Sequence, residues 1–215
     1  MNRIHQETNN SLSRVSVQDT IVAYAVNLYN SFIINDPITT VRFILTYRRR
    51  DPEESSSYRD ANNVGNGIYF LEVPVAELPG LADKASAFRK AIVHSRERPN
   101  LEALISARSA LGFEMMQKRQ IMPWSVPGMT LVNGLHHFDY AEEASFGYPG
   151  RAQAYYSSCC CRYLTLTKPN PVQLADGSWK WHVGDVGVGI PVPDGLKEKM
   201  LQQKAQDMEG LLHSF

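Results

Sequence analysis

The chain has 215 residues, of which 43% are hydrophobic and 10% aromatic. This is enough apolar material to bury a core, so the composition predicts a globular protein and excludes general disorder. The 22 basic residues balance 22 acidic residues, which leaves no summed charge to attract nucleic acid or an anionic membrane surface. We expect a cytoplasmic protein, because the sequence has neither an apolar segment long enough to span a bilayer nor the hydrophobic core of a secretory signal.

The first half of the chain predicts one helix and two strands after a polar leader at residues 1–15. Ser16 is a suitable N-cap, and the apolar residues that follow it recur at the spacing of one buried helical face. Alternating apolar residues predict a strand at 38–47. A loop rich in Ser, Asn, Asp and Gly at 51–67 then leads to a second strand at 67–75.

Two helices are predicted next. Apolar residues at helical spacing occupy 81–92, and this helix must end before Pro99 because proline cannot continue a helix interior. Asn100 is predicted to cap a third helix, which extends to Met115.

The last third of the chain predicts strands and a closing helix. Strand-like segments lie at 129–133, 153–167 and 179–190, and we expect the final two to form a hairpin. Asp194 is predicted to cap a last helix with Leu196, Met200, Leu201, Ala205 and Met208 on its inner face. Residues 16–215 are therefore expected to form one domain of mixed α and β structure around one sheet.

The stretch "LHHFDYAEEASFGYPG" suggests catalysis because it contains His136, His137 and Asp139. A histidine titrates near neutral pH, and a nearby carboxylate could orient it as a general base. On a strand His137 and Asp139 would share one face while His136 points to the other, so at most one histidine pairs with Asp139. The alternative is a polar strand end that leads into a loop.

Two further segments have both a functional and a structural interpretation. Arg48 and Arg50 follow a predicted strand and could bind a phosphate, or could be solvated or paired with nearby acids. The segment "NNVGNG" precedes a strand and lacks the spacing of a nucleotide-binding loop, so a turn is favoured. The three cysteines are adjacent, at 159–161, which favours reduced thiols over disulfides or a zinc site. We expect no metal and no tightly bound cofactor.

Several stretches, taken in order, resemble the C-terminal half of the BAHD-type acyltransferases, with the closest similarity to fungal members of secondary metabolism. In that family a Ser/Thr-led helix precedes a strand that ends in Arg-x-Arg, a Gly-Asn strand start, a helix with an arginine and an Asp-Phe-Gly-Trp-Gly motif. The corresponding segments here are "SVQDTIVAYAV", "LTYRRR", "NNVGNGIYF", "LADKASAFRKAIV" and "LVNGLHHFDYAEEASFGYPG". The resemblance implies a chloramphenicol-acetyltransferase-like α/β fold, of which this chain would be only the C-terminal domain.

The resemblance also implies site residues and substrates. An acyl-CoA would be the co-substrate, and a small-molecule alcohol or amine would be the acyl acceptor. Ser16, Arg48 and Arg50 would lie toward CoA, while Asn133 and Leu135 would line the acceptor side. Four residues would be structural landmarks of the family: Gly65, Asn66, Phe146 and Gly147.

The sequence departs from the family in one respect that concerns catalysis. The family's His-x-x-x-Asp motif is absent, because Tyr140 and Ala141 stand four residues after the two adjacent histidines. We therefore expect a split or truncated enzyme whose catalytic histidine is supplied by an N-terminal-half partner chain. The alternatives are a non-acylating small-molecule binding protein, such as a pathway accessory that assists cyclisation, or a decayed fragment.

Overall fold

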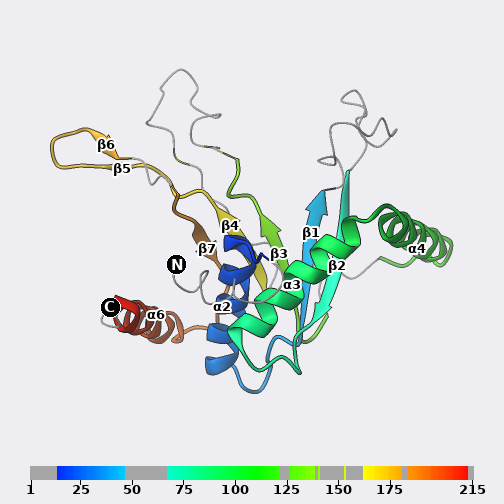
Figure 1. Ribbon diagram of the computed structural model, residues 1–215, viewed down its shortest axis with the longest axis horizontal. Helices are drawn as coiled ribbons and strands as arrows, with labels where there is room; N and C mark the ends of the chain where they lie inside the picture. Colours follow the sequence, from blue (N-terminus) through cyan, green and yellow to red (C-terminus); the bar gives the residue numbers. More distant parts are fainter. Residues whose placement is uncertain are drawn as a thin grey trace.

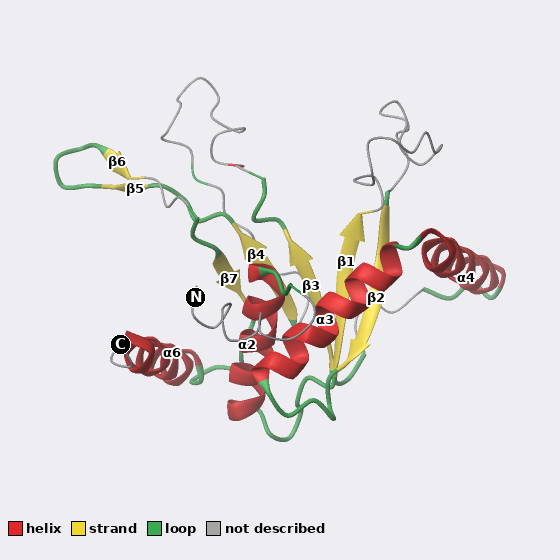
Figure 2. Cartoon of the chain, in the orientation of Figure 1, coloured by secondary structure: helices red, strands yellow, loops and turns green. Residues whose placement is uncertain are grey.

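The computed structural model describes residues 14–46, 67–121, 126–138, 140, 153, 162–180 and 184–212. Within these ranges, helices α2 (Val17–Phe32), α3 (Leu81–Arg96), α4 (Arg98–Gln117) and α6 (Lys197–Leu212) accompany a mixed sheet (Figures 1 and 2). The described part of the chain contains no helix long and apolar enough to cross a membrane. The mixed α/β architecture predicted from the sequence is confirmed.

The main sheet has five strands in the order β2-β1-β3-β4-β7. Its strands are β1 (Thr40–Thr46), β2 (Ile68–Pro74), β3 (Met129–Gly134), β4 (Tyr163–Thr167) and β7 (Gly187–Gly189). The three central strands β1, β3 and β4 are parallel, whereas β2 and β7 run antiparallel to their neighbours at the two edges. The carboxyl ends of β1, β3 and β4 therefore lie at the same edge of the sheet.

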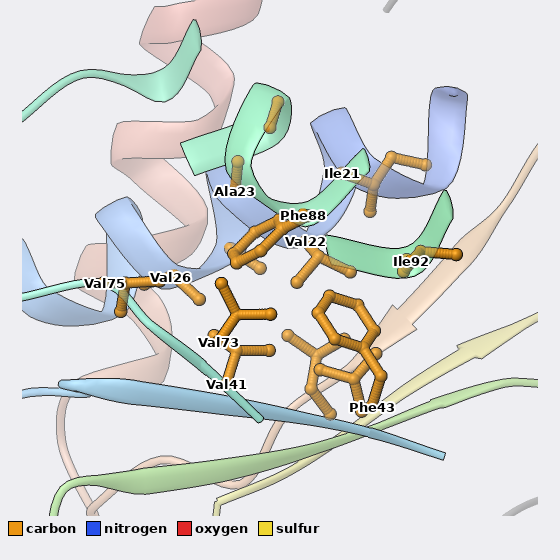
Figure 3. Close-up of a cluster of buried hydrophobic side chains, with 14 of the residues drawn as sticks. Ile21, Val22, Ala23, Val26, Val41, Phe43, Val73, Val75, Phe88 and Ile92 are labelled. Carbon is orange, nitrogen blue, oxygen red and sulfur yellow. The ribbon is translucent and has the colours of Figure 1, made fainter. Parts of the chain in front are cut away.

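Helices α2 and α3 pack on one face of the sheet and form the main core with it (Figure 3). Alternation along β1 turns Val41 and Phe43 toward these helices and Arg42 toward the opposite face. The Phe43 and Phe88 rings meet edge to face, with centroids 5.1 Å apart, an arrangement that aromatic pairs favour. Val15, which precedes α2, is buried in the same core.

Helix α4 begins earlier than the sequence predicted. It starts at Arg98, so Glu97 is the N-cap and the prediction of Asn100 as the cap is wrong. Pro99 lies in the first turn of the helix. A backbone N–H at this position has no intrahelical acceptor, so the lack of an N–H in proline removes no hydrogen bond of the helix. Of the apolar residues in α4, only Leu101 is buried, so this helix packs less on the core than its sequence suggested.

The predicted C-terminal hairpin is present, although it is interrupted. Strands β4 and β7 pair antiparallel, with Leu166 opposite Val188. Between them, β5 (Val172–Gln173) and β6 (Trp179–Lys180) form a second, two-stranded sheet, which projects from the main sheet (Figure 1). Within the strand predicted at 153–167, residues 163–167 form β4, whereas residues 154–161, which include the cysteines, lie outside the described residues.

The closing helix α6 begins at Lys197, so the predicted cap at Asp194 is wrong. Gly195 has a φ of +80°, a left-handed conformation that cannot be part of an α-helix. The helix can therefore start only after this residue. Its inner face is partly as predicted, because Met200 is buried and Met208 half-buried, while Leu201 and Ala205 are exposed.

Candidate functional site

A cavity of about 710 Å³ lies at the carboxyl ends of β1 and β3. Open α/β sheets commonly bind ligands at this edge of their parallel strands. Both strands and the start of β2 form part of the wall. The N-terminal ends of α2 and α4 and the C-terminal end of α3 form the rest. Its polar lining residues are Gln18, Thr46, Tyr69, Arg96, Asn133 and His137.

The pairing of β1 with β3 accounts for the position of the cavity. Ile44 lies opposite Asn133 in the parallel register, so the last residues of both strands reach the same level. Gly134 allows α2 to approach this level, because a Cβ there would lie only 3.1 Å from the side-chain nitrogen of Gln18. The start of α2 therefore closes one side of the cavity.

The two adjacent histidines occupy a turn that follows strand β3, which agrees with the interpretation of this stretch as a polar strand end that leads into a loop. Strand β3 ends at Gly134, and the Phe138 N–H donates to the Leu135 carbonyl at 3.0 Å, which closes a turn around the histidines. Strand alternation therefore does not decide their directions. Their rings meet edge to face with centroids 4.6 Å apart, and Asp139 lies outside the described residues.

His136 and His137 have different environments. His137 is exposed and lines the cavity, whereas His136 does not line it. Burial, and then the neighbouring His137, lower the pKa of His136. The Nδ1 atom of His136 is buried and has no hydrogen-bond partner among the described residues. His137 is thus the histidine with access to a ligand in this cavity.

Asn133 and Leu135 both line the cavity. The Asn133 side-chain amide donates to the Tyr163 hydroxyl at 2.8 Å, which fixes its orientation across two strands. The Leu135 N–H donates to the Leu166 carbonyl at 2.7 Å, so the turn is tied to the end of β4. Their predicted role as residues that line the acceptor side stays a prediction.

Ser16 is the N-cap of α2, as predicted from the sequence. Its hydroxyl donates to Asp19 Oδ2 at 2.7 Å, and its N–H donates to the same oxygen at 2.8 Å. The guanidinium of Arg89 in α3 also forms an ion pair with Asp19, with 2.6 Å between Arg89 Nη2 and Asp19 Oδ2. Asp19 is 1% exposed and Arg89 19% exposed, so this ion pair joins the two core helices. The role of Ser16 in CoA binding stays a prediction.

The other predicted site residues lie outside the described residues, and their roles stay predictions. They are Arg48, Arg50, Gly65, Asn66, Phe146 and Gly147. The first four lie in the sequence between Thr46, at the end of β1, and Ile68, at the start of β2. Both Thr46 and Ile68 line the cavity.

Four polar lining residues were not predicted as site residues: Gln18, Thr46, Tyr69 and Arg96. The Tyr69 hydroxyl lies 3.1 Å from the Ser95 hydroxyl, so this buried tyrosine links β2 to α3. No local motif marks these four positions. The only available signal was their location at the ends of predicted helices and strands.

Among the described residues, no group of three His, Cys, Asp or Glu side chains is arranged to hold a metal ion. The polar groups of the cavity are an imidazole, a guanidinium, two amides and two hydroxyls. Such groups can donate hydrogen bonds to carbonyl or phosphate oxygens, and the imidazole can accept a proton.

The sheet and its helices have the chloramphenicol-acetyltransferase-like fold of the BAHD acyltransferases. A solved structure of vinorine synthase matches this fold with a TM-score of 0.50 and 14% sequence identity. The match covers 93% of this chain but 42% of vinorine synthase, so the chain spans less than half the length of that enzyme. No family model and no curated protein matches the sequence.

Proposed function

We propose that the chain contributes one half of an acyl-CoA-dependent acyltransferase that acylates a hydroxyl or amine of a small molecule. The observation that carries this proposal is the cavity at the carboxyl ends of β1 and β3, which brings His137, Asn133 and Leu135 together within an acyltransferase-like fold. The chain matches less than half of vinorine synthase, which supports a second half on another polypeptide or another part of a longer one.

In the proposed reaction a base removes the proton from the acceptor hydroxyl or amine, whose oxygen or nitrogen attacks the thioester carbonyl. The tetrahedral oxyanion then collapses, the C–S bond breaks, and CoA leaves as a thiolate that takes up the proton. A general base contributes roughly two to four powers of ten to such a rate. The sequence has no His-x-x-x-Asp motif, so we propose that the partner half supplies the base.

His137 is the alternative base within this chain, because it contributes the imidazole to the lining of the cavity and an imidazole can accept a proton. The base could then act without a partner half. Asn133, Arg96 and Gln18 are the lining donors that could stabilise the oxyanion.

The test is an acyl-transfer assay with acetyl-CoA and a panel of alcohols and amines. The chain is assayed alone and together with candidate N-terminal halves that carry His-x-x-x-Asp. We expect transfer only in a combination with such a half. If every combination matches the uncatalysed rate, the proposal is wrong.

The alternative base is tested in any active preparation by comparing His137→Ala with His94→Ala. His94 is an exposed histidine of α3 that does not line this cavity. If His137 is the base, its replacement lowers kcat by at least about a hundredfold, while the His94 variant keeps the rate. Equal rates for the two variants would show that the base lies in the partner half.

A second candidate is a non-acylating protein that holds a reactive small molecule in the same cavity. The missing His-x-x-x-Asp motif in a chain that keeps the cavity favours it. Saturable binding of acceptor-like molecules that does not change when CoA is added would support this function over acyl transfer.

A further inference from the structure

A second cavity, of about 440 Å³, lies beside the edge strand β7, between α2, α6 and the segment that includes β7. Strand β7 is the last strand of the sheet among the described residues, and none of the other described strands pairs with its outer edge. The Tyr24 hydroxyl of α2 donates to Asp207 Oδ2 of α6 at 2.7 Å and holds the two helices together beside the cavity. Figure 1 shows α6 beside α2 at the end of the molecule away from β2.

The walls of this cavity are mainly apolar. Helix α6 contributes Met200, Leu201 and Met208, which recur at the spacing of one helical face. Leu201 is 53% exposed, so the cavity presents an apolar surface to the solvent. The remaining apolar lining comes from α2 and from the chain around β7, namely Ile21, Ala25, Leu28, Val186, Val188, Ile190 and Val192.

The charged side chains that line the cavity are Lys197 and Lys204. No acidic side chain from the described part of the chain lines it, and neither lysine forms an ion pair with a described residue. Asp207 is one turn from Lys204 on the same face of α6, and accepts hydrogen bonds from Tyr24 and Gln203. Lys197 lies in the first turn of α6, and the nearby carboxylates of Asp194 and Glu198 do not line the cavity.

We propose that this cavity binds an amphipathic anion, namely a medium-chain aliphatic carboxylate. The carboxylate pairs with Lys197, and the hydrocarbon chain lies along Met200 and Leu201 against α2. At about 30 Å³ for each heavy-atom group, the share of a water molecule in the liquid, a cavity of about 440 Å³ accommodates about fifteen such groups. The proposal does not depend on the acyltransferase function, because this cavity and the one beside His137 share no lining residue.

The test is isothermal titration calorimetry of the full chain with decanoate, decanol and decyltrimethylammonium. We expect decanoate to bind at one saturable site, and the neutral and cationic probes to bind at least about tenfold more weakly, since they lack the pairing with Lys197. The matched variants are Lys197→Glu and Lys199→Glu. Both reverse one exposed charge in the first turn of α6, but Lys199 does not line the cavity.

We expect Lys197→Glu to weaken decanoate binding at least about tenfold and Lys199→Glu to leave it within about twofold. The proposal is overturned if decanoate does not bind the wild-type chain, or if both variants weaken binding equally. It is also overturned if sedimentation shows a dimer that Leu201→Glu dissociates, because the apolar surface would then be an interface between two copies of the chain.

Discussion

Asp19 and Asp83 occupy the same position, the third residue of a helix, but their surroundings differ. Each accepts a hydrogen bond from the N–H of the N-cap residue, Ser16 or Gly80. Asp19 is buried and also holds Arg89, whereas Asp83 is exposed and has no ion pair with a described residue. The same local motif therefore has a tertiary function in α2 only.

We expect Asp19→Ala to lower the free energy of unfolding by about 3–5 kcal/mol, because it leaves Arg89 without its partner in a largely buried position. Asp83→Ala is the matched control and should cost about 1 kcal/mol or less. Urea unfolding of both variants measures the difference. If Asp19→Ala does not fold, Asp19→Asn keeps the size of the side chain and should lie between the two. Equal losses for Asp19→Ala and Asp83→Ala would contradict this role.

His136 predicts a pH dependence of stability. Its pKa is lowered in the folded state by burial and by His137, so the unfolded chain binds a proton at a higher pH than the folded chain does. Above the ordinary histidine pKa of about 6.5 both states are neutral at this position, and His136 does not affect stability. As the pH falls below that value, protonation favours the unfolded state and the free energy of unfolding decreases.

Urea unfolding between pH 7.5 and pH 5 measures this effect. The wild-type chain should lose stability as the pH falls, and His136→Gln should lose less over the same range because glutamine does not titrate. Parallel curves for the two proteins would show that His136 contributes nothing to the pH dependence.

At the scale of elements, α4 is packed at one end and exposed at the other. Leu101 is 4% exposed, whereas Leu111 is 44% exposed in the same helix. Near Leu101 the helix contacts the core, and toward its C-terminal end Phe113 and Met116 are also exposed. The apolar pattern of the sequence did not distinguish the two ends, because burial depends on which neighbours the tertiary fold supplies.

We therefore expect Leu101→Ala to destabilise the protein by about 2–5 kcal/mol and Leu111→Ala by less than about 1 kcal/mol. The two variants make the same chemical change in the same helix, so helix propensity contributes equally to both. Thermal or urea unfolding monitored by circular dichroism measures the difference. A large loss with Leu111→Ala would show that the exposed end of α4 is covered in solution.

Across the whole molecule, the two cavities lie at different places on one sheet. The larger one lies at the carboxyl ends of the parallel strands, and the smaller one lies beside the edge strand β7. The chain matches less than half of vinorine synthase, so the proposed acyl transfer is a property of this half combined with another. The proposed binding of a carboxylate beside α6 involves only residues of this chain.

The sequence by itself determined the local elements. Ser16 and the apolar spacing after it define α2, and alternation defines β1, because caps and periodicity depend only on neighbouring residues. The sequence did not predict where α6 and α4 begin. The left-handed conformation of Gly195 sets the start of α6, and α4 includes Pro99 in its first turn. The interpretation of His136 and His137 as part of a polar strand end that leads into a loop agrees with the turn after Gly134.

Only the tertiary structure decided which residues meet. The parallel pairing of Phe43 with Val132 joins segments far apart in the chain, and no local pattern encodes the partner of a buried strand. That pairing brings Thr46, Arg96 and His137 to one cavity. The acyltransferase resemblance could predict Asn133 and Leu135 as wall residues, but the cavity itself arises from long-range strand order and helix packing.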